Sequence, residues 1–430
     1  MKLKDWDRNL KIRLFGEWLI NVLSWAFYPF MAIYFSASFG KSTAGLLLVL
    51  SQLISVGTNL IGGYCADRFG RRRMMLFASI GEGCTLLLFA FANSPWLESP
   101  VLSFICFSAL GVCLSFYMPA SHAMIADLVP IKYRNEVFAV FYTSMNIAVV
   151  LGPLIGSFFF FHYRFELLLF ATFASLIVTL LLARYVRETL PQKKSEREST
   201  QPKTWYQAVL KQLGDYRIIA RDKVFLLYIV AGILVAQTLT QLDLLIALYS
   251  TEVVPTQTLF ALGDFSIRLE GEKIFAWLLA ENGILIVFFT VLVTKWMAKY
   301  SERKVFIISS LLFGLGMMFF GATVSIWVMM FAILLFTMGE LMVVGIQQGF
   351  VARLAPEHMR GQYFAAASLR FAIGRTIAPL AIPLAGWIGF GWGFVVLGCL
   401  PFISALLYHA MFEQLKKREA GLQGEVKQSS

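Results

Sequence analysis

The fold is decided by the stretch Gly63-Tyr64-Cys65-Ala66-Asp67-Arg68-Phe69-Gly70-Arg71-Arg72-Arg73, which lies between two long apolar runs. Its arginines favour the anionic inner face of a membrane and oppose translocation of the loop. A simple positive-inside turn explains the arginines but neither Asp67 nor the two glycines. An Asp is poorly placed at the negative C-terminal end of a helix, so we expect Asp67 to accept hydrogen bonds from the N-terminus of a neighbouring helix.

The composition is that of a polytopic membrane protein. Of 430 residues, 58% are hydrophobic and only 15% are charged, with a mean hydropathy of +0.70, whereas a soluble globule carries about 25% charged residues. The net charge of +11 is spread between the apolar runs, so the expected partner is the membrane lipid surface and not nucleic acid. The five cysteines and four histidines are scattered and predict neither a disulfide framework nor a metal site.

Charged residues, Pro and Gly divide the chain into twelve apolar segments, each near the roughly 20 residues that a spanning helix requires. The segments run over 12–36, 43–64, 74–93, 101–125, 137–160, 165–186, 224–248, 274–297, 305–324, 326–352, 362–388 and 391–412. Only Val324 and Ser325 separate the ninth from the tenth. The charged start of the chain runs directly into the first segment without a small-residue cleavage site, so we expect a retained helix.

The distribution of basic residues predicts that both termini are cytoplasmic. With the N-terminus inside, all but six of the 37 Lys and Arg residues fall on cytoplasmic segments, as the positive-inside rule requires. The six exceptions are Lys41, Arg164, Arg268, Lys273, Arg370 and Arg375.

The longest polar stretch, residues 187–223, divides the segments into two sets of six. We therefore expect a six-helix bundle over residues 1–190, a cytoplasmic linker over 191–223, a second six-helix bundle over 224–414 and a cytoplasmic tail over 415–430. Within the linker, residues 205–213 have helical spacing of apolar side chains, which predicts a short helix at the membrane interface. Two six-helix halves are typical of parallel repeats in transporters.

Two motifs carry a family resemblance. The opening stretch resembles the G-x-L-A-D-R-x-G-R-K loop of the major facilitator superfamily, with Cys65 and Arg72 in place of Leu and Lys. In the fifth segment, Ala148-Val-Val-Leu-Gly152-Pro153-Leu-Ile-Gly156-Ser157 resembles the g-x-x-x-G-P-x-x-G-G signature of the drug:proton antiporter branch. The resemblance implies an all-α fold of twelve transmembrane helices in two bundles and alternating-access transport by a monomer.

The resemblance also assigns roles to the residues of both motifs. It places a cytoplasmic gate at the loop and beyond the fourth segment, although solvated loop charge would explain the latter pair equally well. The gate residues are Gly63, Asp67, Arg68, Gly70, Arg71, Asp127 and Arg134. In the fifth segment, the small residues Ala148, Gly152 and Gly156 form a smooth stripe that permits close approach of a partner helix, and Pro153 adds a kink. Ordinary small-residue packing alone would explain that stripe.

Acids within the apolar segments are functional candidates, because an Asp at a helix centre costs about 2.5–3.5 kcal/mol to insert. Glu340 and Asp243 match the T-x-G-E and Q-x-D positions of lactococcal-type multidrug/proton antiporters, and by that resemblance they bind protons and cationic drug. Those relatives carry a further acid in F-x-x-D-Y, where this chain has Phe141. Substitutes for this acid are Glu17, Glu82 and Glu281, although Glu17 and Glu281 are close enough to the segment ends to extend toward water.

Two arginines in the eleventh segment favour a different cargo. Arg370 can extend toward the cytoplasm, whereas Arg375 needs a carboxylate partner or an anionic substrate. Many drug antiporters carry an arginine where this chain has Phe107, so Arg375 is a candidate for part of that proton-relay role.

The preferred interpretation is proton-driven export of amphipathic, cationic small molecules. Alternatives are a flippase for lipids or glycolipids and an exporter of an anionic metabolite. A membrane-embedded transferase and a non-transporting sensor belong to other classes. With no phosphate-binding loop and no nucleophile–base pair in the sequence, we expect an ion gradient to drive the protein, without a cofactor and without enzymatic activity.

Overall fold

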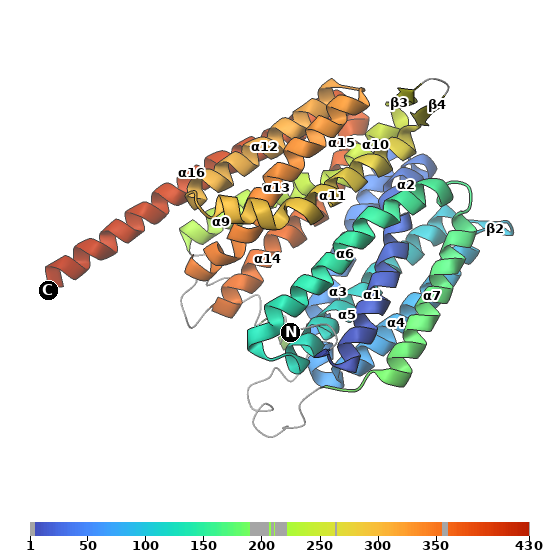
Figure 1. Cartoon of the computed structure of the whole chain (residues 1–430), viewed down its shortest axis with the longest axis horizontal. Helices are drawn as coiled ribbons and strands as arrows, with labels where there is room; N and C mark the ends of the chain where they lie inside the picture. Colours follow the sequence, from blue (N-terminus) through green and yellow to red (C-terminus); the bar gives the residue numbers. More distant parts are fainter. Residues whose placement is uncertain are drawn as a thin grey trace. The chain divides into compact units, whose positions relative to one another are not determined.

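The computed structural model describes residues 5–189, 206–207, 210, 222–262, 265–354 and 360–429. The chain forms two compact units, Met1–Lys211 and Gln212–Ser430, which are described separately. Both are helical bundles (Figure 1). Most of the expected interfacial helix at 205–213 lies outside the described residues, as does most of the linker.

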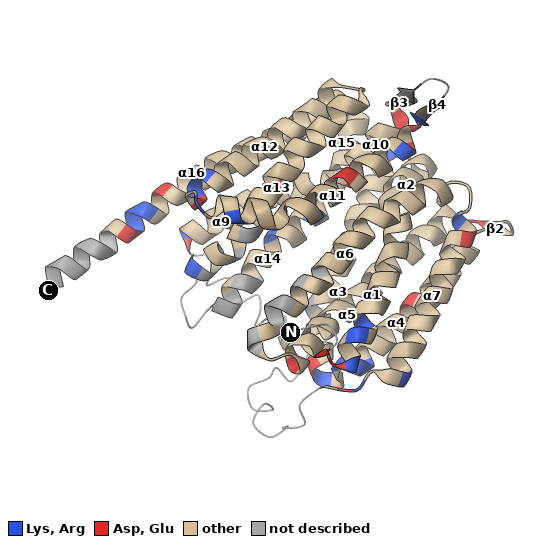
Figure 2. Ribbon diagram, in the orientation of Figure 1, with Lys and Arg blue, Asp and Glu red and all other residues tan. Residues whose placement is uncertain are grey.

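The first unit contains six membrane-length helical segments, the first of which is interrupted by a 3-10 turn. Its elements are α1 (Arg8–Phe27), η2 (Tyr28–Phe30), α2 (Met31–Phe39), α3 (Lys41–Phe69), α4 (Arg71–Phe91), β1 (Asn93–Ser94), β2 (Leu97–Glu98), α5 (Pro100–Leu128), α6 (Ile131–Phe159) and α7 (Arg164–Tyr185). Most of its described Lys and Arg residues gather at the end where α3 meets α4 (Figure 2).

The second unit repeats this pattern and breaks two of its segments. Its elements are α9 (Lys223–Leu239), η3 (Thr240–Leu242), α10 (Leu245–Glu252), β3 (Gln257–Leu262), β4 (Phe265–Leu269), α11 (Gly271–Met297), α12 (Glu302–Ala322), α13 (Ile326–Leu354), α14 (Arg360–Ile377), η5 (Ala378–Leu380), α15 (Ala381–Ile388) and α16 (Phe390–Ser429). Aromatic packing of Tyr228, Phe306 and Phe350 fills the core between α9, α12 and α13.

The expectation of twelve helical segments in two bundles is confirmed. Eleven spans among the described residues are long and apolar enough to cross a membrane, and the apolar part of α6, Thr143–Phe159, is shorter. The narrow division between the ninth and tenth segments is real, because α12 ends at Ala322 and α13 begins at Ile326. The chain is therefore a multi-pass membrane protein.

Three features differ from the sequence expectation. Two antiparallel hairpins, β1–β2 and β3–β4, join helices where no strand was predicted. Strands β1 and β2 have only two residues each, too few for an alternation of apolar and polar side chains. In the second hairpin, Oε1 of Gln257 accepts a hydrogen bond from the Ile326 backbone N–H at 3.0 Å. This bond connects the hairpin to the start of α13. The third difference is the end of the chain, where α16 continues as helix through the expected tail to Ser429.

The small residues of α6 pack directly on α1. A Cβ added at Gly156 would lie 2.1 Å from the carbonyl oxygen of Ala26, and one added at Gly152 would lie 2.4 Å from Cβ of Trp25. Ala148 and Pro153 are buried in the same helix. The two backbones approach each other as closely as small residues permit.

Candidate functional site

The charged loop places Arg71 between two carboxylates. Helix α3 ends at Phe69 and α4 begins at Arg71, whose side chain is almost fully buried. Its Nη1 lies 2.8 Å from Oδ1 of Asp67 and 2.6 Å from the carbonyl oxygen of Ala66, and its Nε lies 3.3 Å from Oδ2 of Asp127. One guanidinium thus links the end of α3, the start of α4 and the end of α5.

Glu188 accepts hydrogen bonds from the N-terminus of a helix. The expectation that Asp67 does so was wrong. Glu188 follows α7, and its Oε1 and Oε2 accept the backbone N–H groups of Arg71 and Arg72 at 2.9 and 3.2 Å. This is the first turn of α4, where a negative charge is favourable. A Cβ at Gly70 would lie 2.4 Å from Oε2 of Glu188, so the glycine admits the carboxylate.

The remaining predicted gate residues are Arg68, Gly63 and Arg134. Arg68 points along its own helix, and its Nη1 donates to the Tyr64 hydroxyl at 2.6 Å. Gly63 faces open space. Arg134 lies in α6, and its side chain is outside the described part of the structure.

An ion pair within α1, with a buried arginine and a partly buried glutamate, lies near the same end of the first unit. Arg13 Nη2 lies 2.9 Å from Oε1 of Glu17 in α1, and the Arg13 guanidinium also hydrogen-bonds with Ser121 of α5. The same Glu17 oxygen accepts from Ser121 Oγ at 2.9 Å and from the Tyr117 hydroxyl at 3.2 Å. The guanidinium carbon lies 5.3 Å from the ring centroid of Phe141, the position where similar antiporters carry an acid. Glu17 is thus the counter-charge of Arg13.

Glu82 occupies a separate place in the first unit. It lies in α4, partly buried, and interacts with Ser175 of α7. Tyr117 is within electrostatic range of both Glu82 and Glu17. The structure therefore brings two of the three candidate substitute acids near one tyrosine of α5.

The second unit brings Asp243 and Glu340 within electrostatic range of each other. Asp243 directly follows η3, and Glu340 lies in the middle of α13. The side-chain amide of Asn282 in α11 interacts with Glu340 and donates from Nδ2 to the Thr337 hydroxyl at 2.9 Å. The charge of Arg375 in α14 acts on Asp243, although its side chain is exposed and, in the described part of the structure, forms no ion pair with Asp243 at salt-bridge distance.

The remaining predicted residues of the second unit lie outside this acidic group. Arg370 is buried and hydrogen-bonds with the Tyr228 hydroxyl and Oε1 of Gln347, so the expectation that it extends toward the cytoplasm was wrong. Glu281 precedes Asn282 and therefore lies about 100° around the helix from it. Its Oε2 is buried without a hydrogen-bond partner among the described residues.

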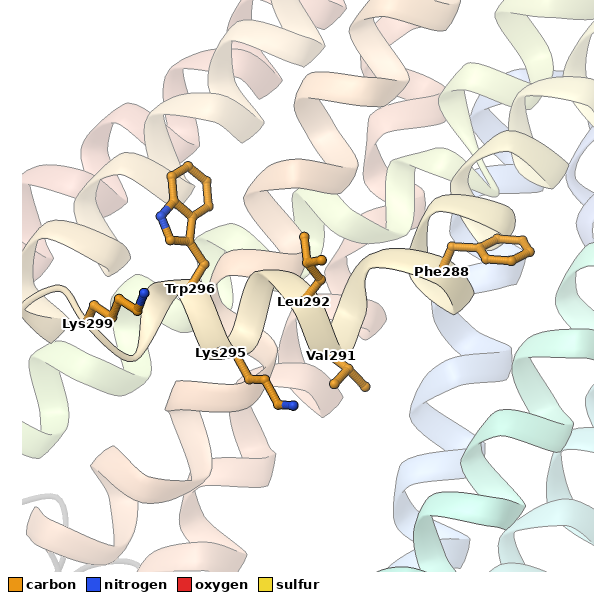
Figure 3. A pocket seen from close by; sticks show the side chains of 6 residues that line it. All are labelled: Phe288, Val291, Leu292, Lys295, Trp296 and Lys299. Carbon is orange, nitrogen blue, oxygen red and sulfur yellow. The ribbon is translucent and has the colours of Figure 1, made fainter.

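The surface groove shown in Figure 3 is distinct from both polar groups. Five of its lining residues belong to α11 and the sixth follows that helix; they are Phe288, Val291, Leu292, Lys295, Trp296 and Lys299. An exposed apolar stripe that ends in Lys and Trp is typical of a helix at the membrane interface. Among the described residues, no three His, Cys, Asp or Glu side chains cluster in a way that could hold a metal ion.

Several polar residues of these sites were not singled out by the sequence interpretation. Arg13 was counted with the charged N-terminus, although its i, i+4 spacing to Glu17 was a visible signal of a helical ion pair. Asn282 is a polar residue deep in an apolar segment and adjacent to a candidate acid. Glu188 could not be identified from the residues around it in the sequence, because it accepts hydrogen bonds from Arg71 and Arg72, which lie more than one hundred residues away.

Comparison with known proteins places the chain among transporters. The family model described as Major Facilitator Superfamily matches residues 14–267 and 269–428. A protein of Planococcus maritimus named Na(+), Li(+), K(+)/H(+) antiporter is 52% identical over 97% of this chain and 99% of its own length. The multidrug resistance protein MdtH of Shigella dysenteriae is 27% identical over 85% of this chain and 82% of its own length.

Solved structures of low sequence identity share the fold. A POT family transporter in complex with 5-aminolevulinic acid has a TM-score of 0.74 at 17% identity and covers 94% of this chain and 96% of its own. A D-xylose-proton symporter has a TM-score of 0.67 at 16% identity and covers 93% of this chain and 96% of its own. At this identity the likeness shows the fold alone.

Proposed function

Because the chain belongs to the Major Facilitator Superfamily, we propose that it is a proton-coupled antiporter that exports monovalent cations, with alkali metal ions as its main substrates. The 52% identical Planococcus maritimus antiporter supports this choice of substrate. In the proposed orientation both termini are cytoplasmic, and the linkage of Asp67, Arg71 and Asp127 lies on the cytoplasmic side.

The observation that carries the proposal is the acidic group of the second unit. Asp243 and Glu340 come from different helices and act on each other, and Asn282 and Thr337 add neutral polar atoms beside them. Hard monovalent cations are bound by oxygen ligands, and carboxylates inside a membrane mark ion and proton pathways. Neither carboxylate is neutralised by an adjacent lysine or arginine at salt-bridge distance among the described residues.

Exchange follows from the chemistry of a carboxylate. A proton on Asp243 or Glu340 removes the negative charge that a cation needs, so proton and cation compete for the same group. A cation bound from the cytoplasm is released outside when the carboxylates take up protons. Return of the protonated site and loss of its protons to the cytoplasm complete one cycle. The buried pair of Arg13 and Glu17 has a structural role in this scheme.

A second candidate is export of amphipathic organic cations. The 27% identity to MdtH and the match of Asp243 and Glu340 to the Q-x-D and T-x-G-E positions favour it. The same carboxylates would bind both classes of cation. A flippase or anion exporter has less support, because Arg370 is engaged by Tyr228 and Gln347 and Arg375 acts on Asp243.

Purified protein in proteoliposomes tests the proposal. An acidic interior is imposed, and a pH-sensitive dye reports proton release when NaCl, LiCl, KCl or choline chloride is added outside. We expect the three alkali salts, and not choline, to dissipate the gradient. A parallel assay of ethidium transport tests the second candidate. Proton release that is the same with choline as with sodium would sink the alkali cation proposal.

Matched variants assign the activity to the acidic group. Glu340→Gln and Asp243→Asn are each expected to abolish cation-dependent proton release. Glu270→Gln is the control, because Glu270 is an exposed acid of the same unit that pairs with Lys273 at 3.5 Å. If the Glu340→Gln and Asp243→Asn variants exchange cations as well as the control does, other residues carry the transport.

A further inference from the structure

Two broken helices of the second unit meet at their breaks. Helix α9 is interrupted by η3 and helix α14 by η5, and the Nε2 of Gln241 in η3 donates to the carbonyl oxygen of Ala378 in η5 at 3.1 Å. One turn away, a Cβ at Gly374 would lie 2.8 Å from the backbone nitrogen of Gln237. Interruptions at matching positions in a transporter place backbone carbonyls where they can coordinate ions.

The side-chain amide of Gln241 is held in one orientation. Its residue is fully buried, and Nε2 donates to three acceptors: Ala378 O, Gln237 O at 3.2 Å and Gln237 Oε1 at 2.9 Å. If the amide nitrogen and oxygen of Gln241 exchanged places, Oε1 would lie against these three acceptor oxygens and no hydrogen bond could form. The nitrogen position is therefore fixed by its surroundings, and the opposite position belongs to Oε1.

The Oε1 atom of Gln241 is buried and has no hydrogen-bond partner among the described residues. A buried acceptor without a donor costs about 1–3 kcal/mol, so a folded protein retains one when another group satisfies it. A cation satisfies an orphaned oxygen as well as a donor does. The negative charge that a cation also needs is offered by Asp243, which directly follows η3, two residues after Gln241.

We propose that Gln241 Oε1 and the Asp243 carboxylate are ligands of one alkali metal ion at the η3 break. The inference rests on the proposed function and gives the cation a location within the acidic group. The amide supplies the neutral oxygen and the carboxylate supplies the charge. The positive charge of Arg375 acts on Asp243. An incoming alkali ion takes the place of this arginine as the charge that balances the Asp243 carboxylate. Glu340 interacts with this site through Asp243.

Binding of radioactive ²²Na⁺ to the purified full-length protein tests the assignment. The test variants are Gln241→Leu and Gln241→Met, which fill the space without a hard oxygen. We expect each to raise the dissociation constant of Na⁺ about tenfold or more, because an oxygen that contacts a charge is lost. Unchanged binding in either folded variant overturns the assignment.

The matched control is Gln237→Leu. Gln237 is the same residue type on the same helix and is equally buried, but its Oε1 already accepts from Gln241. Gln241 Nε2 keeps two acceptors in this variant, so the affinity for Na⁺ is expected to remain within about twofold of the wild type. A loss of binding as large as in the Gln241 variants would show a general effect of polar burial and would also overturn the assignment.

Two further readouts separate the possible failures. If wild-type protein neither binds Na⁺ nor exchanges it for protons, the proposed function fails; if it does both and Gln241 is dispensable, only the site fails. A structure of the wild type with Tl⁺, a strongly scattering analogue of alkali ions, needs no variant to fold. Density in contact with Gln241 Oε1 is expected, and density only elsewhere contradicts the proposal.

Discussion

Arg13 and Glu17 stand one turn apart in α1 and form an ion pair inside the first unit, with Nη2 2.9 Å from Oε1. The arginine has no exposed surface, and the carboxylate also accepts hydrogen bonds from the hydroxyls of Ser121 and Tyr117. A buried charge is tolerated when it is paired and hydrogen-bonded. Phe141 of α6 faces this arginine, so the counter-charge of Arg13 comes from its own helix, α1.

The first prediction concerns the loss of this counter-charge. Glu17→Gln leaves the buried Arg13 uncompensated and is expected to destabilise the protein by about 3–5 kcal/mol. Thermal unfolding of the purified protein in detergent measures the effect. The double variant Arg13→Met with Glu17→Leu removes both charges and is expected to recover most of the loss. A double variant that is less stable than Glu17→Gln would contradict the argument.

The second prediction concerns Gly70, whose φ of +102° and ψ of 151° are accessible almost only to glycine. Gly70→Ala is expected to cost about 1–3 kcal/mol of stability and to displace the Glu188 carboxylate, which lies 2.4 Å from the new Cβ position. Unfolding in increasing denaturant measures the loss.

Glu188→Ala separates the two effects at Gly70. Alone, it removes the acceptor for two N–H groups of the first turn of α4 and is expected to cost about 1 kcal/mol. In the double variant the contact with Glu188 is absent, so Gly70→Ala should cost less than it does in the wild type. Strict additivity of the two changes would show that the carboxylate and the glycine are independent.

The helical framework was predictable because it depends on local features of the sequence. These are the hydropathy of each segment and the charged, Pro and Gly residues that separate the segments. Val324 and Ser325 were enough to divide two long helices. The small residues around Gly152 indicated a close contact with another helix, but they did not identify that helix as α1. The interruption of α9 at Gln241 was not predictable in the same way. No proline lies within η3, and the break is matched by packing against η5, more than one hundred residues away.

The polar sites were predictable as candidate residues but not as groups. Asp243 and Glu340 were recognisable because acids are rare in apolar segments. Their grouping with Asn282 and Arg375 depends on which faces of four helices meet. Arg370 shows the limit clearly, since distance along a helix suggested access to water, whereas neighbouring helices supply Tyr228 and Gln347 instead.

The third prediction concerns the bridge made by Arg71. Its Nη1 contacts Asp67 and its Nε contacts Asp127, and the single ammonium of a lysine does not reproduce this fork of donors. Arg71→Lys is expected to lower the rate of cation-dependent proton release by about tenfold, as the loss of a charged hydrogen bond implies, without changing the half-saturating Na⁺ concentration. Arg68→Lys is the control, because Arg68 is exposed and its Nη1 donates to the hydroxyl of Tyr64 on the same helix. A shift in half-saturation with an unchanged rate would place Arg71 in cation binding.

The fourth prediction concerns the contact of α14 with α9 at Gly374. A Cβ there would lie 2.7 Å from Cβ of Ala236 and 2.8 Å from the backbone nitrogen of Gln237, so Gly374→Ala must separate the helices. Overpacking of this kind costs about 1–3 kcal/mol. Separation also displaces η3 as a whole from η5, which Gln241 contacts through Ala378, and the half-saturating Na⁺ concentration is therefore expected to rise.

Gly349→Ala is the matched control for Gly374→Ala. Gly349 lies inside α13 of the same unit, and an added Cβ there meets no atom within 4 Å. This substitution is expected to leave half-saturation unchanged and to stabilise the protein by about 0.4–1 kcal/mol, because alanine restricts the unfolded chain. Thermal unfolding and cation-dependent proton release are measured for both variants. Equal Na⁺ half-saturation in both would show that the fit between the two broken helices does not position Gln241 for the cation.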